Sequence, residues 1–211
     1  MQRFTQKADL LAAFGRDGHL RGADLSFMEI RAIDLRGVDL TGVVLVGSRL
    51  HDVNLSDCNL SEAHLQESLL SGVSLAGSRM DHSLCQRCQF IDCDFSDALL
   101  AHTSFLLCNL AGLPFRRADL TAAHILSSDL NQADMTGARL PGASLRESSL
   151  EGTLFVSCDL SRVDLRKTNF LESHYERVIT EGAIFYGKSP WDGQCSIEEN
   201  LGKKVIVFDG E

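Results

Sequence analysis

Hydrophobic residues recur along this chain with a period of five. From position 20 to position 175, every position divisible by five holds Leu, Phe, Ile or Met, except Cys85 and Tyr175. A period of five matches neither the 3.6-residue period of an amphipathic helix nor the two-residue period of a half-buried strand. The pattern therefore indicates a chain that turns towards a common core once every five residues. We call these positions the core centres.

Two further registers repeat with the core centres. The position two residues before a centre holds a small or slim residue, such as Ala23, Val38 or Cys58, and the residue between the two is often Asp or Asn. Glycine is frequent two residues after a centre, as at Gly22 and Gly37. One large and one small inward side chain per unit would fill a narrow interior, and Gly would ease a tight corner.

These triplets carry a resemblance to a known family. Ala23-Asp24-Leu25, Cys58-Asn59-Leu60 and Ala118-Asp119-Leu120 fit the pattern Ala-(Asp/Asn)-Leu-X-X, which resembles the pentapeptide-repeat family over about three quarters of the chain. The resemblance implies an all-β fold, a right-handed quadrilateral β-helix with four pentapeptides per coil and about eight coils. With about 4.8 Å between stacked strands, such a solenoid is roughly 38 Å tall.

A solenoid exposes open strand edges at both ends, so the sequence predicts caps around the β-helix of residues 20–175. Residues 1–19 are expected to form an N-terminal cap with a helix over 6–14, or alternatively a docking helix for a partner. Residues 176–211 are expected to form a C-terminal cap with a strand over 204–208. The alternative for this tail is a homodimer contact through Val205, Val207 and Phe208, because the resemblance implies that gyrase-protecting members of the family dimerise through their C-terminal ends.

Composition narrows the function classes. The formal net charge is −9 and the pI is near 5.2, which argues against direct nucleic-acid binding, because neutralising phosphates takes clustered Lys and Arg. No segment approaches the roughly 18 apolar residues needed to span a bilayer, and the first twenty residues lack the features of a secretory signal. Seven cysteines without an export signal favour free thiols, so we expect a cytoplasmic protein that contacts no membrane.

The residues most suggestive of chemistry are Cys85, Cys88 and Cys93. Their spacing invites a zinc interpretation, but their registers point all three into the core, where free Cys acts as a small apolar residue. His82 and His102 are expected to stack one coil apart on one outer face as a solvated pair rather than a catalytic one. No catalytic or nucleotide-binding motif is present. The sequence therefore predicts a protein without enzymatic activity, metal or cofactor.

Four units per coil place residues twenty apart above one another, so each outer residue can be assigned to a face. The acidic face comprises residues 28–32 and every equivalent block twenty residues further on, and it carries six acidic and two basic residues. Beyond Arg31 and Arg49 its acidic residues have no counter-charge: Asp52, Asp92, Asp129, Glu151 and Glu172. This stripe could imitate a DNA strand, although a duplex of 38 Å would carry about 22 charges, far more than the stripe. The alternative is a solvated acidic face.

A second face is unusual for its apolar side chains. The neutral face comprises residues 23–27 and every equivalent block, with four acidic and four basic residues. Its outward registers hold Val44, Val46, Leu84, Leu106, Leu107 and Leu126, with Phe27 above them. Exposed apolar surface of this kind indicates an interface with a partner.

Three functional hypotheses follow. The first is a non-enzymatic module whose flat faces bind another protein. The second, implied by the family resemblance, is a DNA mimic that binds DNA gyrase or topoisomerase IV and protects it from inhibitors. The third is a helper protein of a bacterial secretion system.

Overall fold

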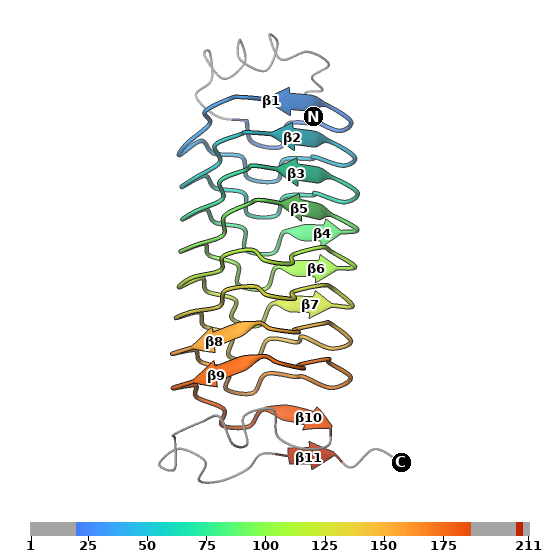
Figure 1. The fold of residues 1–211 in the computed structure, drawn as a ribbon. Coiled ribbons are helices and arrows are strands. Elements are labelled where there is room, and N and C mark those ends of the chain that lie inside the picture. The colour runs from blue at the N-terminus through green and yellow to red at the C-terminus, as the bar shows by residue number, and fades with distance from the viewer. Residues whose placement is uncertain (1–19, 187–205, 209–211) are drawn as a thin grey trace.

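The computed structural model describes residues 20–186 and 206–208 of the chain. These residues form a column of stacked coils that descends as a right-handed helix (Figure 1). The strands are short and pair in parallel: β1 (Glu29–Arg31), β2 (Arg49–His51), β3 (Leu69–Ser71), β4 (Leu84–Gln86), β5 (Gln89–Ile91), β6 (Ser104–Leu106), β7 (His124–Leu126), β8 (Leu154–Val156), β9 (His174–Glu176), β10 (Ile184–Tyr186) and β11 (Ile206–Phe208). The described residues contain no helix, and therefore none that could cross a membrane.

Each coil contains four pentapeptides. Strand partners lie twenty residues apart, so that Ile30 pairs with Leu50 and Leu50 with Leu70 along the sheet β1-β2-β3-β5. Isolated parallel bridges between residues twenty apart extend this pairing along all four faces of the solenoid. The chain makes about seven turns from β1 to β9. The all-β solenoid that the family resemblance implied is confirmed.

Every described corner of the solenoid has a residue with left-handed backbone conformation. All residues two positions after a core centre, from Gly22 to Gly182, have positive φ, and twenty-two of them are not glycine. At most corners the backbone closes a turn, as where the Ala23 N–H donates to the Leu20 carbonyl (3.1 Å). A positive φ at the third residue of such a turn is the signature of type II. The Gly-rich register of the sequence thus corresponds to the corners, as expected.

The Asp and Asn residues before the core centres cap these turns. The Asp39 carboxylate accepts the backbone N–H of Thr41 (3.0 Å), and the Asn59 amide oxygen accepts that of Ser61 (3.1 Å). At these corners the backbone N–H of the residue after the core centre donates to the side chain two residues earlier. This is the Asx-turn geometry that Asp and Asn favour. Much of the acidic character of this chain is therefore structural.

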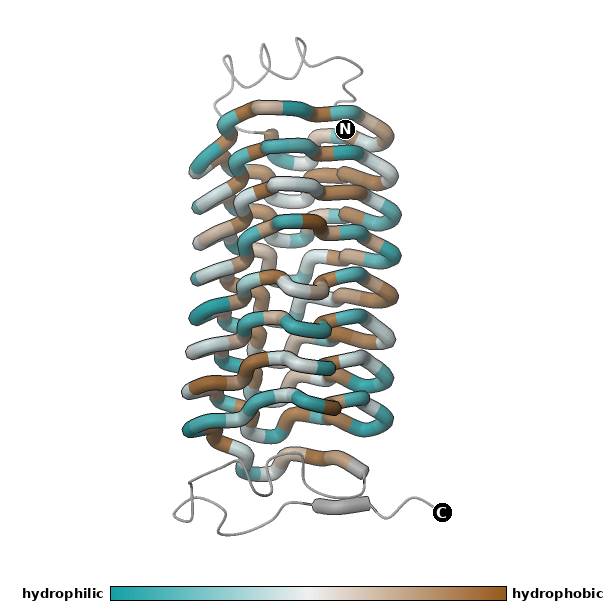
Figure 2. Tube along the Cα trace, in the orientation of Figure 1, coloured by the Kyte–Doolittle hydropathy of each residue, from teal (hydrophilic) through white to brown (hydrophobic). Residues whose placement is uncertain are grey.

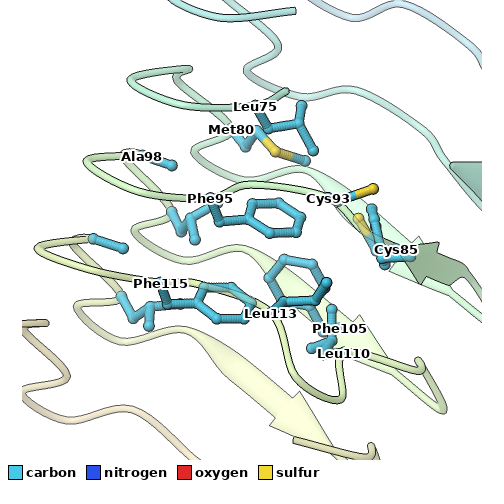
Figure 3. Packing of buried hydrophobic residues seen from close by; sticks show 14 of the residues in the cluster. Leu75, Met80, Cys85, Cys93, Phe95, Ala98, Phe105, Leu110, Leu113 and Phe115 are labelled. Atoms are coloured by element: carbon cyan, nitrogen blue, oxygen red, sulfur yellow. The ribbon is translucent and has the colours of Figure 1, made fainter. Parts of the chain in front are cut away.

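The two inward registers form one continuous core. From Leu20 to Leu165 every core centre is buried, and the small-register residues pack beside them. The brown segments of Figure 2 recur at the same place in each coil because of this alternation. In the middle of the solenoid the rings of Phe95 and Phe115 stack at 4.9 Å, and Phe105 meets Phe95 edge-on (Figure 3).

Six of the seven cysteines lie in this core as free thiols. The Cys158 thiol donates to the Met135 carbonyl (2.8 Å), and hydroxyls in the same register do likewise, as where Thr153 donates to the Leu130 carbonyl (2.8 Å). Burial raises the pKa of Cys58 and of Cys93 to about 11, and that of Cys158 to about 12. The prediction that Cys85, Cys88 and Cys93 point inwards is confirmed, and the other three described cysteines are buried in the same way. Cys195 lies outside the described residues.

The solenoid continues beyond residue 175. Thr180 occupies a core centre and is buried, and Phe185 lies at the next centre within β10. The threonine at position 180 interrupts the apolar pattern of the sequence, but the backbone continues the coil through it. The strand predicted near the C-terminus is present as β11, which pairs in parallel with β10. The predicted helix over 6–14 and the predicted contact residue Val205 lie outside the described residues.

Candidate interaction surfaces

The centre of the neutral face is a leucine-lined hollow. Strands β4, β6 and β7 form its sheet, and their register makes Leu106 and Leu126 direct cross-strand partners. Both leucines are half-buried, and with Ser127, Arg146 and Glu147 they line a pocket of about 260 Å³. The neighbouring Leu84 is 40% exposed and Leu107 is 48% exposed. Two of the six apolar residues predicted for this face therefore line the hollow, and two more, Leu84 and Leu107, are exposed on the same face.

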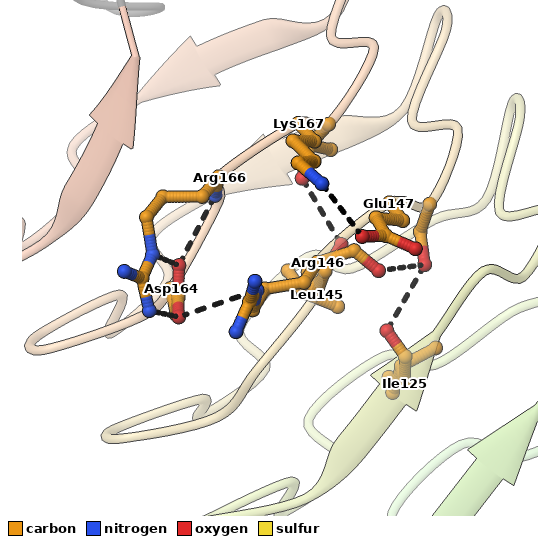
Figure 4. Close-up of polar contacts among 9 residues, drawn as sticks. Ile125, Leu145, Arg146, Glu147, Asp164, Arg166 and Lys167 are labelled. Carbon is orange, nitrogen blue, oxygen red and sulfur yellow. Dashed lines mark hydrogen bonds and ion pairs between the residues drawn. The ribbon is translucent and has the colours of Figure 1, made fainter. Parts of the chain in front are cut away.

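Paired charges border the hollow on its C-terminal side (Figure 4). The Arg166 guanidinium holds the Asp164 carboxylate through two hydrogen bonds of 2.9 and 2.7 Å, whereas Arg146 reaches the same carboxylate only at 4.0 Å. Burial alone would raise the pKa of Asp164, but hydrogen bonds and charge from Arg166 hold it below its ordinary value. Because Arg166 already satisfies Asp164, the Arg146 guanidinium at the pocket rim is only loosely paired.

Two large apolar residues occupy left-handed corners of the same face. Phe27 has φ 60° and is 73% exposed, and Leu107 has φ 56°. The other non-glycine residues at described corners are Asp, Glu, His, Arg, Lys, Gln, Ser or Ala. A bulky side chain at positive φ is strained and gains little from burial when it projects into solvent. Both exceptions lie on the neutral face.

The structure divides the predicted apolar surface into two areas. The N-terminal area contains Phe27, Val44 and Val46, with the Phe27 ring lying against Gly47. Polar residues such as Gln66 and Gln86 separate it from the leucine hollow. Sequence reasoning missed the pocket-lining residues Ser127, Arg146 and Glu147, which could have been found because each lies twenty residues after an apolar or corner position of the same column.

The acidic face has a corner without basic residues. Asp52, Asp92 and Glu172 occupy left-handed corner positions, are exposed and make no ion pair among the described residues. Gly72, Gly112 and Gly152 alternate with them along this corner, with Gln132 as the remaining polar member. Asp52 and Asp92 are therefore two coils apart, about 10 Å. The corner carries an open row of carboxylates, but a sparse one.

The other two predicted acidic residues belong to a hydrogen-bond network. Asp129 accepts the Asn131 N–H (2.9 Å), and the Asn131 side chain in turn accepts the Glu151 N–H (2.8 Å). The Glu151 carboxylate accepts a long hydrogen bond from Asn169 (3.5 Å). Exposed apolar residues, Ile91 and Leu171, interrupt the same face. The structure thus separates the five acidic residues into a corner row and a structural network.

The predicted histidine stack is present. The rings of His82 and His102 lie 5.0 Å apart between centroids with an interplanar angle of 1°. Within residues 20–186, no group of three or more His, Cys, Asp or Glu side chains is placed to hold a metal ion. The predicted contact residues Val207 and Phe208 lie in β11, where the backbone pairs with β10 of the same chain.

Comparison with known proteins agrees with this architecture. The pentapeptide repeats family model matches in eight copies, over residues 19–57, 48–84, 58–97, 88–124, 114–152 and 133–170. The chain belongs to the pentapeptide repeat family. None of the curated proteins matches it.

Two solved structures show a similar fold. One is HetL from the cyanobacterium Nostoc sp. strain PCC 7120, a pentapeptide repeat protein involved in heterocyst differentiation regulation, with 18% identity over 86% of this chain and 98% of that chain, and a TM-score of 0.56. The other is QnrB1, a plasmid-mediated fluoroquinolone resistance protein, with 18% identity over 87% of this chain and 89% of that chain, and a TM-score of 0.55. At this identity the likeness concerns the fold alone.

Proposed function

We propose that this chain is a non-enzymatic protein-interaction module that works in the cytoplasm and binds a protein partner through the leucine hollow of the neutral face. The observation that carries the proposal is that Leu106 and Leu126 line one pocket while Leu84 and Leu107 are exposed on the same face. Such clusters of exposed apolar side chains mark interfaces more often than isolated ones do. The left-handed backbone of Leu107 adds to the argument, because strain at an exposed position indicates selection for something other than stability.

A matched pair of substitutions tests this proposal. Leu84 begins β4 on the neutral face and Leu154 begins β8 on another face, both in the register before a core centre and both 40% exposed. Leu84→Glu should abolish partner capture in a pull-down, and Leu154→Glu should leave it intact. Both variants should fold equally well, because both leucines have the same exposure and register. Equal loss in the two variants, or loss in neither, would show that the leucines of the neutral face are not the binding surface.

Salt dependence gives a second readout of the same surface. Apolar burial involves no Coulomb interaction between charges, so capture should change little between low and high salt. A steep fall of capture with salt would instead point to the acidic corner.

We propose as the second function the protection of DNA gyrase or topoisomerase IV by DNA mimicry. The observation in its favour is the corner row of Asp52, Asp92 and Glu172, in which no basic residue intervenes. The test is a supercoiling assay with fluoroquinolone-poisoned gyrase, with and without this protein. Protection should be abolished by the triple variant Asp52→Lys, Asp92→Lys and Glu172→Lys. The control variant Asp97→Lys, which reverses the charge of a residue that pairs with Arg117, should leave protection intact.

A further inference from the structure

We propose that His82 and His102 form a two-histidine site for a divalent transition-metal ion of the Ni²⁺, Cu²⁺ or Zn²⁺ type on the outside of the solenoid. The two imidazoles project from equivalent corners of successive coils, with φ 60° and 58°. Their ring centroids lie 5.0 Å apart and the rings are parallel within 1°. Imidazole nitrogen is a preferred ligand of these ions.

The backbone fixes the two corners and leaves the rings free. The His82 N–H donates to the Ala101 carbonyl (3.3 Å), and the His102 N–H donates to the Thr121 carbonyl (3.0 Å), so the corners are held one coil apart. Both side chains are exposed. A metal–nitrogen distance of about 2.0–2.1 Å requires ligating nitrogens within about 4.2 Å of each other. Two exposed rings stacked at 5.0 Å reach this separation by tilting towards each other, without any movement of the coil.

The surroundings of the pair favour a cation. Glu62 precedes His82 by one coil at the same corner position and makes no ion pair among the described residues. Asp81, adjacent to His82, pairs with Arg79 at 3.4 Å. Among residues 20–186 no third His, Cys, Asp or Glu side chain converges on the pair, so water would complete the coordination. From the sequence we expected a solvated pair at His82 and His102, and no metal at the inward cysteines. The parallel rings of the outer pair lead us to a different conclusion for these two histidines.

The pair is unique among the histidines of the chain. Of the seven histidines, no other two are twenty residues apart. His124 is an exposed histidine whose neighbours one coil away are Ser104 and Ser144. It therefore provides a single-histidine control in the same solenoid, and Ser144→His would build a second pair beside it.

Titration of the untagged, full-length chain with Ni²⁺ alone, followed by isothermal calorimetry, tests the site. We expect one equivalent of Ni²⁺ to bind, and His82→Asn or His102→Asn to weaken that binding at least about tenfold, while His124→Asn leaves it unchanged. Asn suits the left-handed corner, and circular dichroism should show unchanged folding. In the gain arm, Ser144→His should add a second equivalent. Binding that is absent, that survives both corner substitutions or that falls equally in His124→Asn would overturn the proposal.

Discussion

The residue two positions after each core centre is where this sequence departs furthest from ordinary backbone preferences. Left-handed backbone costs an L-residue about 1–2 kcal/mol, and glycine avoids that cost. Twenty-two described corners nevertheless carry side chains, among them Asp57, Arg117 and Lys167. At some of these corners an ion pair between coils offsets the cost of the left-handed backbone, as with Arg117 and Asp97 and with Lys167 and Glu147. Leu107 has no such compensation, which is why it stands out as a candidate contact residue.

Leu107→Gly tests this view at the level of one residue. The lost burial of a half-exposed leucine and the greater freedom of unfolded glycine should roughly offset the relief of left-handed strain. We expect the free energy of unfolding in urea to stay within about 1 kcal/mol of the wild type. Partner capture should fall at the same time. A loss of stability of several kcal/mol would show that Leu107 serves the fold instead.

At the scale of the element, each coil is held by side chains that repeat every twenty residues. The aromatic column of Phe95 and Phe115 stacks ring on ring, and Phe155 with Tyr175 repeats the arrangement further along the same face. Burial raises the pKa of Tyr175 to about 12, and the Ser173 hydroxyl donates to its phenol oxygen (3.2 Å). The same vertical rule that stacks these rings places His82 over His102.

Substitution of Phe95 measures the strength of this packing. Phe95 is fully buried and touches three other phenylalanine rings, so Phe95→Ala should destabilise the protein by about 3–5 kcal/mol through lost burial and a cavity. Phe95→Asp should prevent soluble folding, because it buries an unpaired charge in mid-solenoid. Denaturant unfolding of the alanine variant and the soluble yield of the aspartate variant provide the measurements. A soluble, stable aspartate variant would contradict the structure.

At the scale of the whole molecule, the buried thiols make the free energy of unfolding depend on pH in the alkaline range. The pKa of Cys58 and Cys93 is raised from 9.0 to about 11 and that of Cys158 to about 12, chiefly by burial, so these thiols stay protonated in the folded state while the unfolded chain ionises. The unfolded state therefore binds fewer protons above pH 9, and the free energy of unfolding falls as pH rises from about 9 to 11.

Thermal unfolding between pH 7 and 10.5 should show this decline, and Cys158→Ser should reduce it. Serine fits the position because Ser128 and Ser148 already donate to carbonyls from the same register. In addition, the described thiols should react with a thiol reagent only when the protein unfolds. A folded chain in which Cys158 reacts at once would contradict its burial.

The sequence by itself determined the fold and the inward or outward direction of most side chains. A single uninterrupted frame of five fixes which residue of each unit faces the core, because a shift by one position would expose the core centres and bury the Asp and Asn residues that precede them. The stack of His82 on His102 and the burial of six cysteines follow from the same arithmetic. Among the described residues, Thr180 departs from the apolar pattern, because a hydroxyl side chain occupies a buried core centre there.

The tertiary structure decided what the outer residues do. Asp129 and Asp52 are equivalent in a count of charges, yet Asp129 accepts a backbone N–H whereas Asp52 projects from a corner and forms no ion pair with the described residues. Leu106 and Leu126 line one pocket because their strands pair in register. Val46 lies in the same column, but the two intervening coils place Gln66 and Gln86 between it and these leucines. A repeat specifies the direction of each side chain, but hydrogen bonds and contacts between coils depend on distances that the pattern of residue types does not contain.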